Sequence, residues 1–392
     1  MRIRKHIFAI LLTLFLLLPV FYFVDGPWSY LGLTKSTDVG YNYAVKISEG
    51  DFSVGSYKSI TPEVFLKGRH IVKDLAKNIT RNDTTDLEKA QSLVKWTFLH
   101  VRSQSAGPNT VIQDDFLGIL RRGWGFCDQK AHIYATLATQ VGIPSRQLQL
   151  FKNKYESPHT LSESYINGKW IVIDSWRGFI PLDKSGNPVT KEELASSDLI
   201  EYFKGMQSKD FLNAKIYKTY PYTSNLNIVR KIFDRILNRV KSLTSMGLVT
   251  TSQKNQIFQK IDLPKAQVEK LDEARLAHLE LKYDLAIMKY TRISEDRVYH
   301  ELIRDQAKFW LGVALADNLQ FDRSIATFRA HYVEFPQSAF RKSDLRFEAE
   351  ILLIKNQRKQ ALKILEQLKT EQARVSVLLL KNNLYYTNPK LI

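Results

Sequence analysis

One cysteine in the chain lies where a thiol nucleophile is expected. Cys127 is the only cysteine among 392 residues, and His159 and Asp174 follow it along the chain. A thiol becomes an effective nucleophile when an imidazole shares its proton and a carboxylate orients that imidazole. The three residues therefore predict a site in which Cys127 attacks, His159 transfers protons and Asp174 orients His159. Alternatively, Cys127 is a small buried hydrophobic residue and the other two have structural roles.

The segment around Cys127 predicts a helix that begins at the thiol. Apolar residues recur at helical spacing over residues 128–141, and Gly142 forms the expected stop signal. Gly123 and Gly125 precede the cysteine and give the backbone freedom for a tight approach. At a helix N-terminus, the positive end of the helix dipole favours a thiolate, and free backbone N–H groups could hold an oxyanion.

A β-hairpin is predicted to bring the histidine and the aspartate together. Residues 160–166 and 169–174 alternate or carry β-branched side chains, and the turn between them is Asn167-Gly168. This pair favours a two-residue type I′ turn, which fixes the register of the strands. With that register, His159 and Asp174 are diagonal neighbours on one face, close enough to hydrogen-bond.

These stretches resemble the transglutaminase-like superfamily, whose core uses papain-like Cys-His-Asp chemistry in that chain order. The resemblance covers roughly residues 83–185 and includes a helical run over 86–101. It implies an α+β core in which a nucleophile helix packs on an antiparallel sheet. It also implies an enzyme that attacks amide or peptide bonds through a Cys127 thioester. Water as the acceptor would make it a peptidase or amidase, and an amine would make it a transglutaminase-type acyltransferase. The matching motifs are Gly123-Trp124-Gly125-Phe126-Cys127-Asp128-Gln129-Lys130-Ala131, Gly142-Ile143-Pro144-Ser145-Arg146, His159 to Glu163, and Asn167 to Asp174.

The side chain that would stabilise the oxyanion is not identified. Gln104 and Gln113 lie upstream of Cys127, where a papain-like site could use an amide, and Trp124 is an aromatic alternative. Each of the three also has an ordinary structural interpretation. We expect no cofactor and no metal, because the single cysteine and the scattered histidines lack ligand spacing.

The N-terminal segment predicts a membrane anchor. Arg2, Arg4 and Lys5 precede an apolar run from Ile7 to Val24, which spans about 27 Å as a helix and matches the bilayer hydrocarbon thickness. A long signal sequence is the alternative, although the bulky residues over 19–26 favour an uncleaved anchor. The positive flank predicts a cytoplasmic N-terminus with the bulk of the chain extracytoplasmic, as at a bacterial inner membrane facing the periplasm.

The chain is strongly basic, with a formal net charge of +17. Residues 228–243 predict an amphipathic helix with apolar residues on one face and Arg and Lys on the other. On an anchored protein, such a helix could contact anionic lipid or an acidic polymer. A solvated face on a packed helix is the alternative. Nucleic acid is not expected as a partner, because no nucleic-acid-binding motif is evident.

The last third of the chain contains an internal repeat. Residues 280–290 recur at 318–328 and more weakly at 355–365. This pattern resembles tetratricopeptide repeats, which imply stacked helix pairs with a concave surface that holds a peptide or protein partner. A helical bundle without a ligand is the alternative.

Five regions are therefore expected. They are an anchor or signal sequence at 1–26, a connecting region at 27–82, a transglutaminase-like domain at 83–220, a basic helix and linker at 221–265, and all-α tetratricopeptide-like repeats at 266–392. The sequence predicts a membrane-anchored, extracytoplasmic cysteine enzyme that hydrolyses or transfers acyl groups on a protein or peptide substrate, with the repeats recruiting substrate or partner. The alternative is a non-catalytic scaffold in a membrane-bound envelope or surface-polysaccharide assembly.

Overall fold

A computed structural model describes the larger part of the chain. The described residues are 42–48, 51–56, 62–103, 116–152, 157–203, 206–216 and 260–386. Several predicted features lie outside them, namely the apolar run 7–24, the candidates Gln104 and Gln113, and the basic helix 228–243. Across the described ranges, every helix is too short or too polar to cross a membrane.

The nucleophile helix forms as the sequence predicts. Helix α6 spans Cys127–Gln140, so the thiol belongs to its first residue. Gly142 has a φ of +88°, and the N–H of Ile143 donates to the carbonyl of Ala138 at 3.0 Å, which ends the helix in a Schellman-type turn. Helix α4 spans Asp86–His100 and begins with a capping box at Thr85 and Glu88. Helix α5 spans Phe116–Arg122.

The predicted hairpin is present with the predicted register. Strand β6 spans Thr160–Ile166 and β7 spans Lys169–Ile173, and Ile166 pairs with Lys169. Asn167 and Gly168 have φ values of 51° and 84°, as a type I′ turn requires. With β5 (Ser145–Gln149) and β8 (Lys215–Ile216), these strands form an antiparallel sheet of order β7-β6-β5-β8.

Helices cover both faces of this sheet. On one face lies α6, whose Ala131 carbonyl accepts a hydrogen bond from Ser162 at 3.2 Å. The other face carries Leu148, Leu161 and Val172, which pack in one buried cluster with residues of three helices. Those helices are α7 (Lys191–Ala195), α8 (Ser208–Leu212) and α16 (Glu371–Lys381). Helix α16, the last helix in the described part of the chain, therefore packs against the sheet that is flanked by His159 and Asp174.

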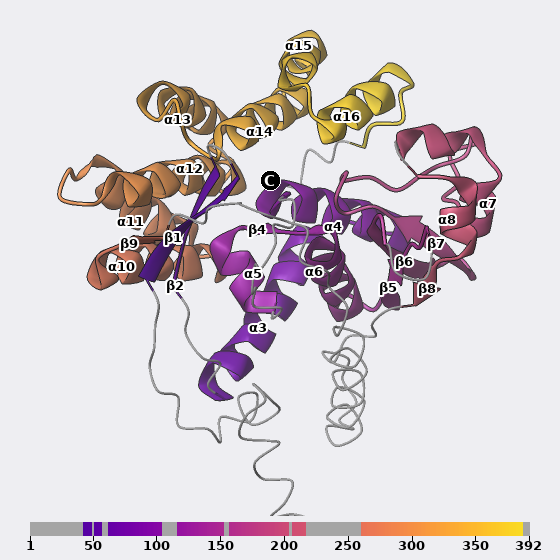
Figure 1. Ribbon diagram of the computed structural model, residues 1–392, viewed down its shortest axis with the longest axis horizontal. Coiled ribbons are helices and arrows are strands. Elements are labelled where there is room, and N and C mark those ends of the chain that lie inside the picture. The colour runs from indigo at the N-terminus through magenta and orange to yellow at the C-terminus, as the bar shows by residue number, and fades with distance from the viewer. Residues whose placement is uncertain are drawn as a thin grey trace, which may run out of the picture. The chain divides into compact units, whose positions relative to one another are not determined.

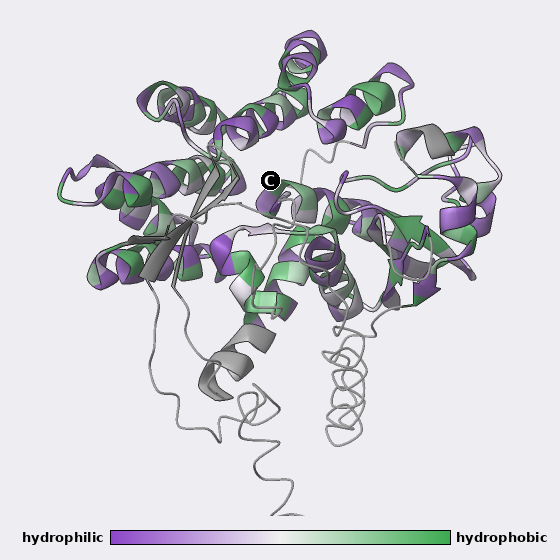
Figure 2. Cartoon of the chain, viewed as in Figure 1, coloured by the Kyte–Doolittle hydropathy of each residue, from purple (hydrophilic) through white to green (hydrophobic). Residues whose placement is uncertain are grey.

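The C-terminal region consists of helix pairs joined by turns of one kind. The pairs are α10 (Lys265–Leu279) with α11 (Tyr283–Glu295), α12 (Glu301–Asp317) with α13 (Phe321–Glu334), and α14 (Arg341–Ile354) with α15 (Arg358–Leu368). Leu281, Leu319 and Asn356 occupy corresponding turn positions, and each is left-handed, with φ between 59° and 62°. In Figure 2 each of these helices has green and purple sides, as amphipathic helices do. The turns recur where the sequence repeats.

Shorter elements complete the described structure. Strands β1 (Asn42–Ser48), β2 (Asp51–Ser56) and β9 (Lys260–Asp262) form a sheet of order β2-β1-β9. Strand β3 (Arg102–Ser103) runs parallel to β4 (Trp124–Gly125), just before Cys127. Helix α3 spans Pro62–Ile79 and a 3₁₀ helix spans Asp198–Tyr202. Figure 1 shows the order of these elements along the chain.

The helix pairs and the transglutaminase-resembling core fall into one compact unit. Phe98 and Leu99 of α4 belong to the same buried cluster as the helix pairs. Arg102 donates to the carbonyl of Ala339 at 3.3 Å, and the imidazole of His100 lies 3.0 Å from the Asp317 carboxylate. Trp310 of α12 packs against Gly123, beside the nucleophile helix. The helix pairs are thus continuous with the core that holds the thiol.

Replacement of Gly123 tests this packing. Gly123 has a φ of +72°, and a Cβ built there would lie 2.1 Å from the Trp310 ring. We expect Gly123→Ala to lower the free energy of unfolding by about 3 kcal/mol, because it combines left-handed strain with overpacking. Gly186→Ala is the matched control, since its φ is +81° and nothing lies within 4 Å of the added Cβ; strain alone costs about 1 kcal/mol. Urea unfolding measures both, and equal losses would contradict tight packing by Trp310.

Candidate active site

The fold places Cys127 at the beginning of α6, with its side chain half-buried. A side-chain amide fixes the chain at this point, because Gln129 accepts hydrogen bonds from the Phe126 N–H at 3.1 Å and from Arg122 at 2.7 Å. The first N–H groups of a helix have no partner within it, and they carry the positive end of the helix dipole. The thiol therefore lies where an anion is stabilised by the backbone.

His159 and Asp174 are in contact, as the hairpin register predicts. His159 lies one residue before β6 and Asp174 one residue after β7. The His159 Nε2 atom is 3.3 Å from both carboxylate oxygens of Asp174, and both side chains are buried. A shift of register by one residue would have put them on opposite faces of the sheet.

The Asp174 carboxylate is held by more partners than the sequence indicates. Oδ1 accepts the N–H groups of Trp176 at 2.9 Å and Arg177 at 3.0 Å, and Oδ2 accepts the Arg177 guanidinium at 2.8 Å. Burial raises the pKa of this carboxyl, but the charges of His159 and Arg177 and their hydrogen bonds lower it by more. The net result is a pKa below the usual range, so Asp174 is ionised.

The same balance acts on His159 with the opposite sign. Burial lowers the pKa of the imidazole, but the charge and hydrogen bond of Asp174, together with a hydrogen bond to the Cys127 thiol, raise it to about 9. Since Asp174 binds Nε2, the nitrogen left for the thiol is Nδ1. The arrangement is therefore a chain of thiol, imidazole and carboxylate, in which a proton can move from sulfur to nitrogen.

The structure describes one of the three oxyanion candidates. Trp124 is buried next to the N-terminus of α6, with the Arg122 guanidinium 4.7 Å from the centre of its ring. Gln104 and Gln113 lie outside the described residues. Among the residues that are described, no group of three or more His, Cys, Asp and Glu side chains is arranged to hold a metal ion.

Two charged residues of the site were missed in the sequence. Lys130, one turn after Cys127, is buried and donates to the Phe98 carbonyl at 3.3 Å and to Ser103 at 3.0 Å; burial, with the charge of Arg346, holds its pKa well below the usual value. Arg177, which follows Asp174 by three residues, donates a hydrogen bond to its carboxylate. Lys130 likewise lies three residues after Cys127. Because Lys and Arg are usually exposed, their burial had no sequence signal.

One family model matches the part of the chain that contains this site. Residues 73–175 match the family model described as the transglutaminase-like superfamily, so this segment is a transglutaminase-like domain. The match does not extend to the helix pairs, and their identity as tetratricopeptide repeats stays a prediction. No curated protein matches the chain.

Three solved structures are similar in part. A candidate cysteine protease of Cytophaga hutchinsonii is 24% identical over 28% of this chain and 38% of its own, with a TM-score of 0.24. A candidate protease of Parabacteroides distasonis is 15% identical over 31% and 27%, with a TM-score of 0.25. A protein described as a TGase is 19% identical over 50% and 54%, with a TM-score of 0.29. The chain thus spans at most about half the length of these proteins.

We expect Asp174→Asn to reverse the direction in which the pKa of His159 is shifted. With the carboxylate present, the imidazole pKa is about 9. Without its charge, burial dominates, and we expect the pKa to fall below the ordinary 6.5. NMR of ¹³C-labelled histidine, with the His159 signal assigned by its absence in His159→Gln, measures the change. A pKa that stays near 9 in the Asn variant would mean that Asp174 does not control the imidazole.

Proposed function

We propose that the transglutaminase-like domain is a cysteine enzyme that cleaves amide bonds in a protein or peptide substrate through Cys127, His159 and Asp174. The observation that carries this proposal is the hydrogen-bonded His159–Asp174 pair in contact with a thiol at a helix N-terminus. Because the pair is buried and the carboxylate has four hydrogen-bond donors, the imidazole is held in one orientation.

The chemistry follows from the three side chains. In acylation, the Cys127 sulfur forms a bond to the carbonyl carbon, and the C–N bond of the amide breaks. His159 carries the thiol proton and gives it to the leaving nitrogen, while Asp174 stabilises the imidazolium. Backbone N–H groups at the start of α6 stabilise the charge on the carbonyl oxygen. Attack on the thioester by water gives hydrolysis, and attack by a primary amine gives acyl transfer; in either case His159 takes a proton from the acceptor and returns it to sulfur.

The full-length chain tests this proposal with an unfolded, glutamine-containing protein and a fluorescent primary amine as substrates. Fluorescence in the protein reports acyl transfer, released ammonia without fluorescence reports amide hydrolysis, and new N-termini report peptide cleavage. We expect Cys127→Ala to abolish the reaction and His159→Ala to slow it by about 10²–10⁴-fold, because general acid–base catalysis is lost. His300→Ala is the matched control, since His300 is an exposed histidine that caps α12.

The second candidate is a non-catalytic scaffold, and iodoacetamide distinguishes it without a substrate. Cys127 is the only thiol, so the rate of labelling reports this site alone. An activated thiol is labelled faster than free cysteine at pH 7, and more slowly after His159→Ala. Slow labelling that His159→Ala and His300→Ala leave unchanged would favour the scaffold, in an envelope or surface-polysaccharide assembly as the sequence suggests.

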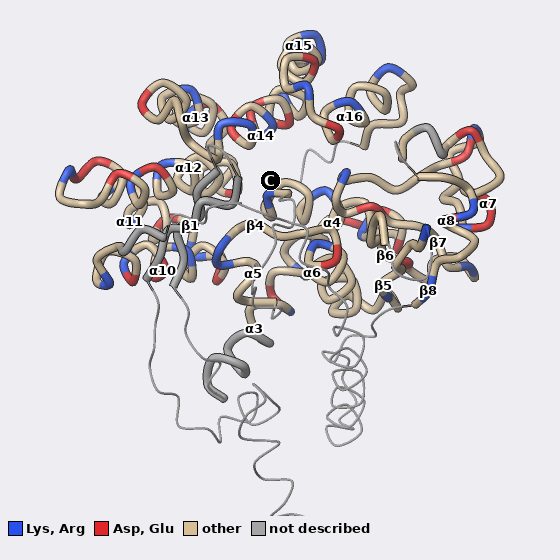
Figure 3. The backbone as a smooth tube through the Cα atoms, in the orientation of Figure 1, with Lys and Arg blue, Asp and Glu red and all other residues tan. Residues whose placement is uncertain are grey.

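We also propose that the domain acts outside the cytoplasm, anchored by the apolar run 7–24, with a basic flank on the cytoplasmic side. Residues 228–243 are the proposed contact for anionic lipid or an acidic polymer. In the described part of the chain, by contrast, Lys and Arg are interspersed with Asp and Glu along the helix pairs (Figure 3). The helix pairs are proposed to recruit a protein partner or the substrate, on surfaces that the core does not cover.

Membrane fractionation tests the anchor. We expect the full-length chain to remain in the membrane fraction after an alkaline wash and to require detergent for release. A chain that lacks residues 1–26 should appear in the soluble fraction, apart from any salt-sensitive portion bound through residues 228–243. A full-length chain released by the alkaline wash would contradict an uncleaved anchor.

A further inference from the structure

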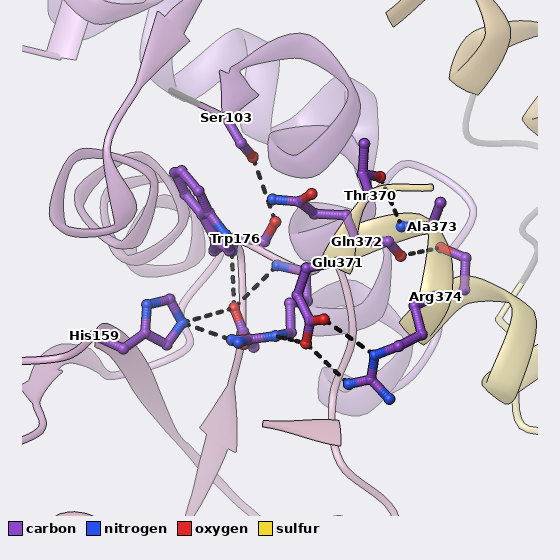
Figure 4. A network of polar contacts seen from close by, with 11 residues as sticks. Ser103, His159, Trp176, Thr370, Glu371, Gln372, Ala373 and Arg374 are labelled. Atoms are coloured by element: carbon purple, nitrogen blue, oxygen red, sulfur yellow. Dashed lines mark hydrogen bonds and ion pairs between the residues drawn. The ribbon is translucent and has the colours of Figure 1, made fainter. Parts of the chain in front are cut away.

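A carboxylate from the C-terminal helix reaches the active-site cluster. Glu371 is the first residue of α16, whose N-cap is Thr370. The Glu371 Oε1 atom lies 3.7 Å from the Arg177 Nε atom, which is an ion-pair distance. Glu371 is also bound by Arg374, at 2.9 Å and 3.0 Å. Figure 4 shows Glu371 and Arg374 of α16 on the side of this cluster opposite His159.

Arg177 joins this carboxylate to Asp174. Its guanidinium donates to Asp174 Oδ2 at 2.8 Å through Nη1 and faces Glu371 with Nε. The side chain is 4% exposed, so its charge has little access to water and depends on paired carboxylates. The same Asp174 carboxylate also balances the positive charge of the protonated His159 imidazole. Because Glu371 offsets part of the positive charge of Arg177, the Asp174 carboxylate stabilises the protonated imidazole more strongly.

Packing fixes Glu371 in this place. Val375 and Leu379, on the same helix, belong to the buried cluster that contains Leu161 and Val172 of the sheet. Beyond the helix end, Asn382 donates to the Tyr202 hydroxyl at 3.1 Å. The helix therefore packs on the sheet along its length and is bound to the 3₁₀ helix beyond its end, so Glu371 is held by more than its own ion pairs.

We propose that Glu371 is a positioning residue for the Cys127–His159–Asp174 site, which acts through Arg177 to keep the Asp174 carboxylate oriented and charged toward His159. This proposal deepens the proposed function and rests on it. The C-terminal region then contributes to the reaction itself, in addition to any partner that it binds. A chain that lost α16 would keep the three reacting side chains but lose the second carboxylate on Arg177.

Several titratable or charged groups face the His159–Asp174 pair. Cys127 and Lys130 come from α6, Arg177 from the loop after β7, and Glu371 from α16 behind Arg177. Arg346 of α14 acts on Lys130. Among these, Glu371 can be changed without touching a group that contacts Cys127 or His159. Its removal takes one negative charge from the cluster and should make the protonated imidazole less favourable.

The experiment compares two variants that remove opposite charges from one helix turn. In Glu371→Gln, we expect the His159 pKa, measured by ¹³C NMR in the full chain, to fall by about half a unit, and iodoacetamide labelling at pH 7 to slow about threefold. In Arg374→Gln, Glu371 keeps its charge and loses a competing partner, so we expect the His159 pKa to stay or rise. Glu371→Asp, which restores the charge, should recover most of the loss.

The outcomes separate the two proposals. If both variants lower the His159 pKa equally, Glu371 only stabilises the start of α16, and the positioning role is wrong. If Glu371→Gln changes neither the pKa nor the labelling, the role is also wrong, even where His159→Ala still slows labelling. If His159→Ala itself has no effect on labelling or turnover, the proposed function fails first. Glu366→Gln is a further control, because Glu366 of α15 forms an exposed ion pair with Lys381 at the end of α16.

Discussion

The burial of the Asp174 carboxylate is the constraint on which the rest of the site depends. The side chain has no contact with solvent, and an ionised carboxylate is tolerated there only if it is paired and fully hydrogen-bonded. Its donors are His159, the Arg177 guanidinium, and the N–H groups of Trp176 and Arg177. His159 must be brought to the carboxylate by the hairpin, whereas the other three donors come from the two consecutive residues Trp176 and Arg177.

Local geometry meets most of these requirements. The two-residue turn sets the register that brings His159 to Asp174. After β7, the N–H groups of Gly178 and Phe179 donate to the Asp174 carbonyl at 2.8 Å and 3.1 Å. This tight loop directs the preceding N–H groups at the carboxylate, and Gly178 has a φ of +77° there. The guanidinium of Arg177 differs, because besides Asp174 it faces a second carboxylate from a distant part of the chain, that of Glu371 on α16.

Sequence reasoning reached the local parts of the site and missed the distant ones. The start of α6, its stop at Gly142, the hairpin register and the His159–Asp174 contact follow from short-range rules of turns and helix ends. The packing of Trp310 on Gly123 and the ion pair of Arg177 with Glu371 join residues far apart in the chain. Helical periodicity shows that a face is buried but does not show what covers it. For the same reason, the sequence divided core from repeats where the structure has shared hydrophobic clusters.

The paired charges also set the pH range in which the site stabilises the fold. Burial opposes the charge of Asp174, but His159 and Arg177 outweigh it, and its folded pKa lies below the ordinary 3.8. This contribution is therefore present above pH 3.8 and lost as the pH falls through the lowered value. For His159, Asp174 outweighs burial and raises the pKa from 6.5 to about 9, so that contribution is complete below pH 6.5 and lost as the pH rises through 9. Both stabilising contributions are therefore complete only between about pH 3.8 and pH 6.5.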